Sequence, residues 1–240
     1  MFGFTIFDIK GTIAKPLGDV RVRQAMNYAI DRKTIVAKIL GGYGAVNASM
    51  PFGADSAGYT KSLDDTYTYD PAKAKALLAE AGYPNGFTLD VLNNPQWDQM
   101  AQTLAGYLRA VGVNVKLSNH LSDLVQQTNS GKWAMGMSFQ SVTGLPYTDV
   151  SSSMTSTASL NPLKNNDPKI DSLLRQSTNA TGSQQQKAFA ELAAYAAQQA
   201  WFVAPALTSQ LHGYNPKIVK VVEPKRAGAP ALYNLTPSQG

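Results

Sequence analysis

The 240-residue sequence predicts an α/β fold, and three observations carry this prediction. Residues 71–81 have the periodicity of an amphipathic helix, and residues 87–92 follow with the alternation of a strand. The succession of strand and helix then continues to residue 139 with short connections. Apolar residues make up 44% of the chain and charged residues 15%, which is ordinary for a globular protein with a real core. One domain is the expected organisation.

The first expected element is a strand at residues 4–9, where side chains alternate, and we expect it to pair beyond this domain. A helix follows from Asp19, whose carboxylate can cap the free N–H groups of the first turn. Asp31 begins a further helical turn. Arg21 and Arg23 have the chemistry of anion ligands, but on a capped helix start we expect them to be exposed or salt-bridged.

Residues 69–83 contain a helix together with its start and its stop. Asp70 can accept hydrogen bonds from the first turn, and Pro71 fits the first helical position, where an N–H group is not needed. Gly82 supplies the left-handed residue that ends the helix. The apolar stripe at helical spacing consists of Ala74, Leu77, Leu78 and Ala81.

Three strands, at residues 87–92, 113–117 and 135–139, alternate with helices at residues 97–111 and 121–130. This succession predicts parallel strands joined by crossover connections. In such sheets ligands bind at the carboxyl ends of the strands. The candidate ligand-binding residues that follow the first and third strands are Asn93, Asn94, Trp97, Phe139, Gln140 and Ser141.

Two long segments, residues 43–68 and 143–168, are rich in glycine, proline and small polar residues and have no periodicity. We expect them to be loops, and loops of this length in a globular domain are often functional.

The last part of the chain predicts two helices, at residues 168–177 and 184–199, and a strand system that begins at residue 201. Residues 217–222 alternate charged and apolar groups in the manner of an edge strand, and a turn-rich tail follows.

Composition excludes several kinds of chemistry. The chain has no cysteine, so disulfides, thiolate metal sites and cysteine nucleophiles are impossible. His120 and His212 have no metal ligand at helical spacing, and no glycine-rich phosphate loop joins a strand to a helix. We therefore expect no metal, no cofactor and no enzymatic activity; the adjacent Asp64-Asp65 pair is the weak remaining case for a hydrolase.

The net charge of +5 does not predict a nucleic-acid partner. The tryptophans Trp97, Trp133 and Trp201 fall at core-like positions, away from the basic residues near the C-terminus, whereas nucleic-acid surfaces place aromatic and basic groups together.

Two strings resemble the family 5 extracellular solute-binding proteins, the peptide and nickel class of ABC importer components. The first string is Asp19-Val20-Arg21-Val22-Arg23-Gln24-Ala25 with Asn27-Tyr28-Ala29-Ile30-Asp31-Arg32. The second is Tyr69-Asp70-Pro71, Lys73-Ala74, Leu77-Leu78 and Glu80-Ala81-Gly82-Tyr83. The resemblance runs over residues 16–235, nearly the whole chain, and corresponds to the C-terminal lobe of such a protein.

This resemblance implies a periplasmic-binding-protein-like II lobe, with a mixed sheet and helices on both faces, over residues 1–240. It also implies that residues 1–15 and the tail at residues 223–240 contact a separate N-terminal lobe. The expected partners are a small-molecule solute, that second lobe and an ABC permease in the membrane. The expected location is extracytoplasmic, either periplasmic or lipid-anchored at the cell surface. Residues 1–13 show no secretion signal, which the resemblance places in an N-terminal part before them.

The resemblance also adds Tyr147 to the candidate ligand residues, in the segment where peptide-binding members carry a Trp and an Asp-Tyr-x-Asp-Pro string. No aspartate stands here at the position that meets a peptide's ammonium group. Because aromatic faces and amide groups suit hydroxyl-rich ligands, we expect an oligosaccharide at least as readily as a peptide. Two other functions remain open, namely the ligand sensor of a transcriptional regulator and, less favoured, a hydrolase.

Overall fold

The structure is a computed structural model that describes residues 2–208, 213–222 and 234–238. Its centre is a six-stranded mixed sheet in the order β2-β6-β1-β5-β3-β4. These strands are β1 Phe2–Ile6, β2 Gly44–Val46, β3 Phe87–Asn93, β4 Val113–Asn119, β5 Met135–Phe139 and β6 Phe202–Thr208. Strand β3 is parallel to β4 and to β5, which confirms the parallel arrangement predicted for this part of the chain.

Strand β1 lies in the middle of the sheet, antiparallel to β5 on one side and to β6 on the other. Both of its hydrogen-bonding edges are therefore used within the chain. The expectation that residues 4–9 pair with a strand beyond this domain is wrong. The alternation of side chains predicted a strand here, but β1 covers Phe2–Ile6 rather than residues 4–9. Alternation also carries no information about which strands lie beside it.

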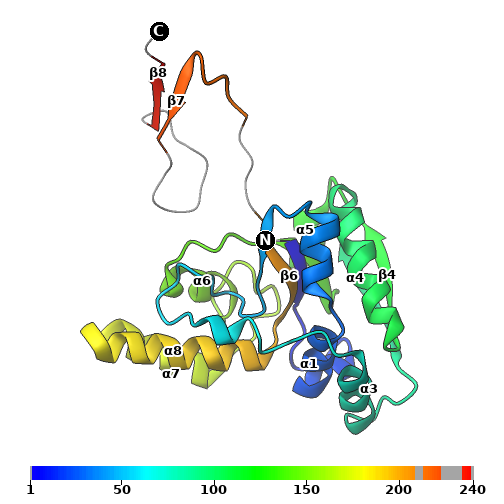
Figure 1. Cartoon of the computed structure of the whole chain (residues 1–240). Helices are drawn as coiled ribbons and strands as arrows, with labels where there is room; N and C mark the ends of the chain where they lie inside the picture. The colour runs from blue at the N-terminus through cyan, green and yellow to red at the C-terminus, as the bar shows by residue number, and fades with distance from the viewer. Residues whose placement is uncertain (1, 209–212, 223–233, 239–240) are drawn as a thin grey trace.

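Helices cover both faces of the sheet, as expected (Figure 1). Successive residues of β6 show the alternation: Val203 packs with helices α1, α3 and α4, whereas Phe202 and Ala204 pack with α6, α7 and α8. The helices are α1 Val20–Tyr28, α2 Arg32–Thr34, α3 Pro71–Glu80, α4 Asp98–Ala110, α5 Leu124–Asn129, α6 Pro146–Ser153, α7 Pro168–Asn179 and α8 Gly182–Gln199. Shorter turns of other helical types are η1 Lys15–Gly18, η2 Ile35–Ile39, η3 Lys61–Leu63 and η4 Pro95–Trp97.

The capping chemistry of α3 is confirmed. The Asp70 carboxylate accepts a hydrogen bond from the backbone N–H of Lys73 at 2.8 Å, and Pro71 occupies the first turn. Gly82 ends the helix with a φ of +91°, the left-handed conformation that favours glycine. On the buried face, Ala74 and Leu78 are almost completely enclosed.

Arg23 and Arg32 are buried, at 3% and 4% exposure, and neither has a carboxylate partner among the described residues. Arg23 donates to the carbonyl oxygens of Gln199 and Leu17, so the expectation that it is exposed or salt-bridged is wrong. Arg32 donates to the carbonyl oxygens of Ala204, Asn27 and Tyr67 and to the Asn27 side chain. Burial lowers the pKa of each arginine to about 10. Arg21, in contrast, forms the expected surface ion pair with Asp19.

The two segments expected to be loops contain regular structure. Residues 43–68 include the short strand β2, which pairs with the end of β6, and residues 143–168 include α6. Both expectations were wrong because three residues of strand are too few to show a period, and because α6 is rich in serine. Pro146 at the start of α6 was the available signal. Similarly, residues 95–97 form a separate turn, so α4 begins at Asp98 rather than Trp97.

Residues 217–222 do contain a strand, β7 Val219–Val221, but it pairs with β8 Leu235–Pro237 in a second sheet of two strands. Figure 1 shows this pair standing apart from the body of the domain, beyond the end of β6. Residues 223–233 and 239–240 of the expected tail lie outside the described residues. Within the described ranges, no helix is long and apolar enough to cross a membrane.

Candidate functional site

One edge of the main sheet gathers the strand ends that the sequence singled out. Asn93 at the end of β3 is in register with Asn119 at the end of β4. Phe2, the first residue of β1, is opposite Phe139, the last residue of β5, because these strands are antiparallel. Strand β6 reaches the same edge, since Phe2 also pairs with Ala206. We call this the carboxyl edge, and ligands in related sheet topologies bind at such edges.

An aromatic cluster lies on the carboxyl edge. The ring of Phe2 is 5.0 Å from the ring of Phe139 and 5.6 Å from the ring of Trp97, measured between centroids. Phe139 is 42% exposed, although it is a large apolar side chain. Phe139 and Trp97 were predicted as site residues, whereas Phe2 was missed. Phe2 precedes the strand predicted at residues 4–9, and the observed strand order brings it to this edge.

Asn93 and Asn94 are buried, at 0% and 6% exposure. The side-chain nitrogen of Asn93 donates to Asn119 at 2.7 Å and to Asp98 at 3.1 Å. Its side-chain oxygen is buried and has no hydrogen-bond partner among the described residues. Asn94 accepts a hydrogen bond from the backbone N–H of Gln96 and so caps the turn that carries Trp97. Both asparagines thus shape the edge from within.

Gln140 and Ser141 follow directly after β5. Gln140 is 3% exposed, and its side-chain nitrogen donates to the hydroxyl of Thr5 at 3.4 Å. Ser141 is exposed and offers its hydroxyl to solvent. The predicted residues therefore divide into buried amides and exposed aromatic or hydroxyl side chains.

Tyr147 lies in the first turn of α6 and is 54% exposed. Two residues later, Asp149 accepts hydrogen bonds from the backbone N–H and the hydroxyl of Thr143. Asp149 is buried, and burial raises its pKa in spite of these bonds. This aspartate closes the loop before α6, so its carboxylate is occupied within the protein.

His120, at the end of β4, is held by its neighbours rather than by a metal. Its backbone N–H donates to the carbonyl oxygen of Asn93 at 2.9 Å, and its Nδ1 lies 3.0 Å from the Asp123 carboxylate. Gln127 also donates to Asp123, and the Trp133 ring meets the imidazole edge-on. Hydrogen bonds from Gln127 and His120 lower the pKa of Asp123 against a partial opposing effect of burial. His212 lies outside the described residues.

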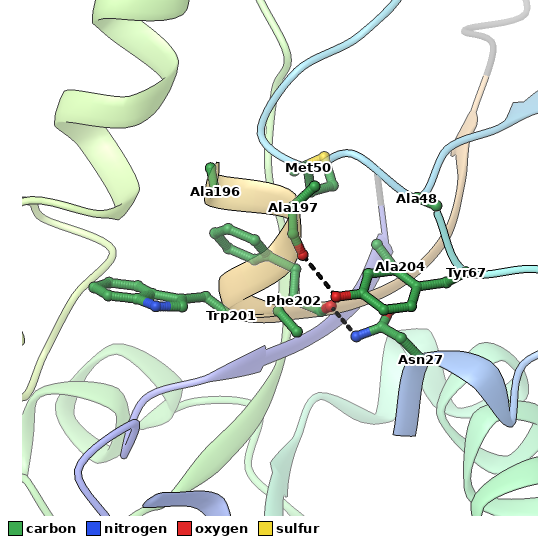
Figure 2. A pocket seen from close by; sticks show the side chains of 10 residues that line it. Asn27, Ala48, Met50, Tyr67, Ala196, Ala197, Trp201, Phe202 and Ala204 are labelled. Atoms are coloured by element: carbon green, nitrogen blue, oxygen red, sulfur yellow. Dashed lines mark hydrogen bonds between the residues drawn. The ribbon is translucent and has the colours of Figure 1, made fainter. Parts of the chain in front are cut away.

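A small cavity and an open depression lie among the described residues. A cavity of about 10 Å³ lies between α8, β6 and the segment around Met50, where Tyr67 donates to the Ala197 carbonyl and Asn27 to the Phe202 carbonyl (Figure 2). This volume is close to that of one water molecule and cannot hold a solute. A depression of about 480 Å³, open to solvent, is lined by residues of α7, α8 and their connection. No group of three histidine, aspartate or glutamate side chains within the described ranges is close enough to hold a metal ion.

Comparison with known proteins decides the family. A family model described as bacterial extracellular solute-binding proteins, family 5 middle, matches residues 1–163, which is more than half of the chain. The chain belongs to this family. The resemblance found in residues 16–32 and 69–83 is therefore confirmed.

Among family 5 relatives, heme-binding protein A of Haemophilus influenzae is 35% identical over 130 residues, covering 51% of this chain and 23% of that protein. The dipeptide-binding protein of Escherichia coli is 40% identical over 110 residues, covering 43% of this chain and 20% of that protein. This chain therefore spans only about a fifth of these relatives in each alignment. By name, these family 5 relatives are binding proteins and not enzymes.

Solved family 5 structures share the fold over most of the chain. The structure of HbpA2 from Haemophilus parasuis superposes with a TM-score of 0.79 at 25% identity and covers 100% of this chain and 48% of that one. The periplasmic binding protein DppA from Helicobacter pylori, solved with the peptide STSA, superposes at 0.75 with 21% identity and covers 86% of this chain and 41% of that one. The periplasmic-binding-protein fold expected from the sequence is thus confirmed, and the chain spans less than half of these solved chains.

Proposed function

We propose that this chain is one lobe of the solute-binding component of an ABC importer, and that it captures an extracytoplasmic peptide or oligosaccharide without chemistry. The observation that carries the proposal is the exposed aromatic side chain Phe139, on the edge where Phe2 and the end of β6 also lie. A large exposed apolar group at the carboxyl edge fits a ligand that is held against a second lobe.

The names of the relatives support a small solute. They are described as binding heme, a dipeptide or glutathione. In our proposal the binding site at the carboxyl edge is the one expected from the sequence. Its members Trp97, Phe139, Ser141 and Tyr147 are exposed or half-buried and would touch the solute. The buried members Asn93, Asn94 and Gln140 would support this surface from inside the protein.

Capture works as a shift between open and closed states. A solute contacts both lobes in the closed state but one lobe in the open state. It therefore binds the closed state more tightly, and this difference in binding free energy favours closure. The closed form is then presented to the permease in the membrane. One lobe by itself makes about half of the contacts, so we propose that this chain binds its solute no tighter than roughly millimolar, equivalent to about 4 kcal/mol.

We further propose that residues 1–15 and 223–240 contact the second lobe. Support comes from β7 and β8, because an isolated pair of strands is marginally stable in water. Ile218 is 64% exposed and Val222 52% exposed beside this pair. Exposed apolar groups at both ends of β7 favour a covering surface.

The test is an NMR titration of the uniformly ¹⁵N-labelled chain with di- and tripeptides and with malto-oligosaccharides. We expect chemical-shift changes only in residues of the carboxyl edge, with a dissociation constant in the millimolar range. Each probe should be recovered chemically unchanged. Micromolar affinity by calorimetry would show a self-contained site and contradict the two-lobe proposal. Turnover of a probe, or shifts confined to the depression between α7 and α8, would contradict solute capture at this edge.

A further inference from the structure

The amide side chains of the carboxyl edge are withdrawn into the protein. Asn93, Asn94 and Gln140 are 0%, 6% and 3% exposed, and each makes hydrogen bonds inside the chain. A site for a sugar needs such groups at its surface, because ring hydroxyls must be matched by donors and acceptors while the ring face stacks. These three amides are therefore buried rather than presented to a solute, including the Asn93 side-chain oxygen, which has no partner among the described residues. Of the predicted polar residues that follow β3 and β5, Ser141 is the exposed one.

The surface that the same edge does present is aromatic. Phe2, Trp97 and Phe139 form a set of three rings, which we call the aromatic platform, and Phe2 contacts both of the others. The planes of Phe2 and Trp97 meet at 62° and those of Phe2 and Phe139 at 49°. These tilted and edge-on arrangements are the favourable geometries for aromatic pairs, and they leave ring faces and edges for a further apolar group.

The aromatic platform is also rigidly supported. Phe2 is held between Phe139 on β5 and Ala206 on β6 by the register of the sheet. Trp97 ends a turn that is capped by Asn94 and runs directly into α4. A platform fixed in this way loses little conformational freedom when it is covered, and preorganisation of this kind strengthens binding.

We infer that the aromatic platform binds an apolar, preferably aromatic, group of the solute, so that this chain selects solutes carrying such a group over hydroxyl-rich sugars. The inference rests on the proposed function and specifies its substrate class. Phe2 is a specificity-determining residue in this account, since its ring contacts both other rings. The physical basis is removal of apolar surface from water together with aromatic pairing.

The experiment compares three probes on the full 240-residue chain: the dipeptide Ala-Phe, the dipeptide Ala-Ser and maltotriose. The readouts are the indole N–H signal of Trp97 and the backbone amide signals of Phe2 and Phe139 in ¹H–¹⁵N spectra. We expect Ala-Phe to shift these signals and to bind about tenfold more tightly than either other probe, the difference that burial of one aromatic side chain can supply.

Variants test whether the preference for Ala-Phe depends on the aromatic platform or on apolar surface elsewhere. Phe139→Ser alters an exposed side chain and should weaken Ala-Phe binding about tenfold while leaving Ala-Ser binding unchanged. Phe2→Ser should do the same, and if it does not fold, Phe139→Ser carries the test. The matched control is Tyr69→Ser, because Tyr69 is 49% exposed and precedes α3, away from the platform. It should leave all three affinities unchanged.

Equal or tighter binding of maltotriose at the carboxyl edge would overturn the inference and leave solute capture standing. Ala-Phe binding that does not move the Trp97 indole signal, or that survives Phe139→Ser, would do likewise. Absence of any shift from all three probes at about 20 mM, well above the millimolar affinity proposed for one lobe, would contradict both the inference and the proposed function.

Discussion

The backbone of Gly86 packs directly on the backbone of Gly112, so that a Cβ atom at Gly86 would lie 1.9 Å from the Gly112 carbonyl oxygen. Gly86 precedes β3 and Gly112 precedes β4, and Phe87 donates its N–H to that same carbonyl. This contact sets the start of the parallel β3–β4 pair whose other ends form the carboxyl edge.

Gly86→Ala is therefore expected to destabilise the chain by about 3 kcal/mol or more, since the added methyl group meets backbone and the φ of +72° is strained for alanine. Gly82→Ala is the matched control, because its φ of +91° is equally left-handed while no atom lies within 4 Å of the added Cβ. It should cost only about 1 kcal/mol. Urea unfolding followed by circular dichroism measures the free energy of unfolding of both variants. Equal losses of stability would show that backbone strain, and not the contact with Gly112, accounts for the effect of Gly86→Ala.

The Asp8 carboxylate should make the free energy of unfolding depend on pH in the acidic range. Burial raises the pKa of Asp8, but hydrogen bonds from the backbone N–H groups of Ala14, Ile13 and Thr12 and from the Thr12 hydroxyl outweigh it, so the pKa is lower than usual. A lowered folded pKa stabilises the fold fully above about pH 4, and this stabilisation is lost as the pH falls through the folded value.

Asp8→Asn should thus cost about 1–3 kcal/mol at pH 7 and less at pH 3, measured by urea unfolding at both pH values. Asp90→Asn, an exposed aspartate on β3 with no side-chain hydrogen bond among the described residues, should change neither value by more than about 0.5 kcal/mol. A loss at pH 3 as large as at pH 7 would exclude a role for the carboxylate charge.

Asp149 should behave in the opposite sense, because burial raises its pKa. Protonation then favours the folded state, so the charged carboxylate destabilises above the folded pKa and this penalty disappears as the pH falls. Asp149→Asn, which keeps an acceptor for Thr143, should stay within about 1 kcal/mol of the parent chain at pH 7, whereas Asp149→Ala should cost about 1–3 kcal/mol. The Thr143 N–H donates to the Asp149 carboxylate, so its hydrogen exchange should become faster in Asp149→Ala and stay unchanged in Asp149→Asn.

Substitution of Arg32 tests how much the hydrogen bonds of this buried guanidinium group stabilise the fold. Lysine cannot reproduce the planar set of donors that Arg32 directs to three backbone carbonyls and Asn27, so Arg32→Lys should destabilise by about 3 kcal/mol or more. The corresponding surface change, Arg21→Lys, disturbs an exposed ion pair with Asp19 and a hydrogen bond to the Glu80 carbonyl oxygen, and it should change the unfolding temperature little because solvent screens both. Similar thermal unfolding of the two variants would contradict this account.

Local chemistry predicted much of the fold. Asp70, Pro71 and Gly82 marked the ends of α3 because capping depends on neighbours in the sequence. The central place of β1 could not be predicted, because the bonds that Phe4 and its neighbours make reach residues far along the chain. The burial of Arg23 could not be predicted for the same reason, because its acceptor, the Gln199 carbonyl oxygen, lies on a helix that is far away in the sequence.

The gathering of the strand ends at the carboxyl edge was predictable from the sequence, but the directions of their side chains were not. The rule that parallel strands present their carboxyl ends together located Asn93, Trp97 and Phe139. It could not tell that the amide of Asn93 turns inward to Asn119 or that Phe2 joins the aromatic side chains. Which way a side chain at a strand end points depends on neighbours supplied by other strands.

The place of β1 between β5 and β6 also bears on how the chain acquires its structure. Thr5 and Ser138, which share a hydrogen bond across β1 and β5, are 133 positions apart in the sequence. During synthesis the first strand emerges long before either neighbour exists, and distant pairings of this kind form slowly. Strand β1 therefore stays without its partner strands until most of the polypeptide has been made, and a truncation before residue 202 would leave its β6 side open to aggregation.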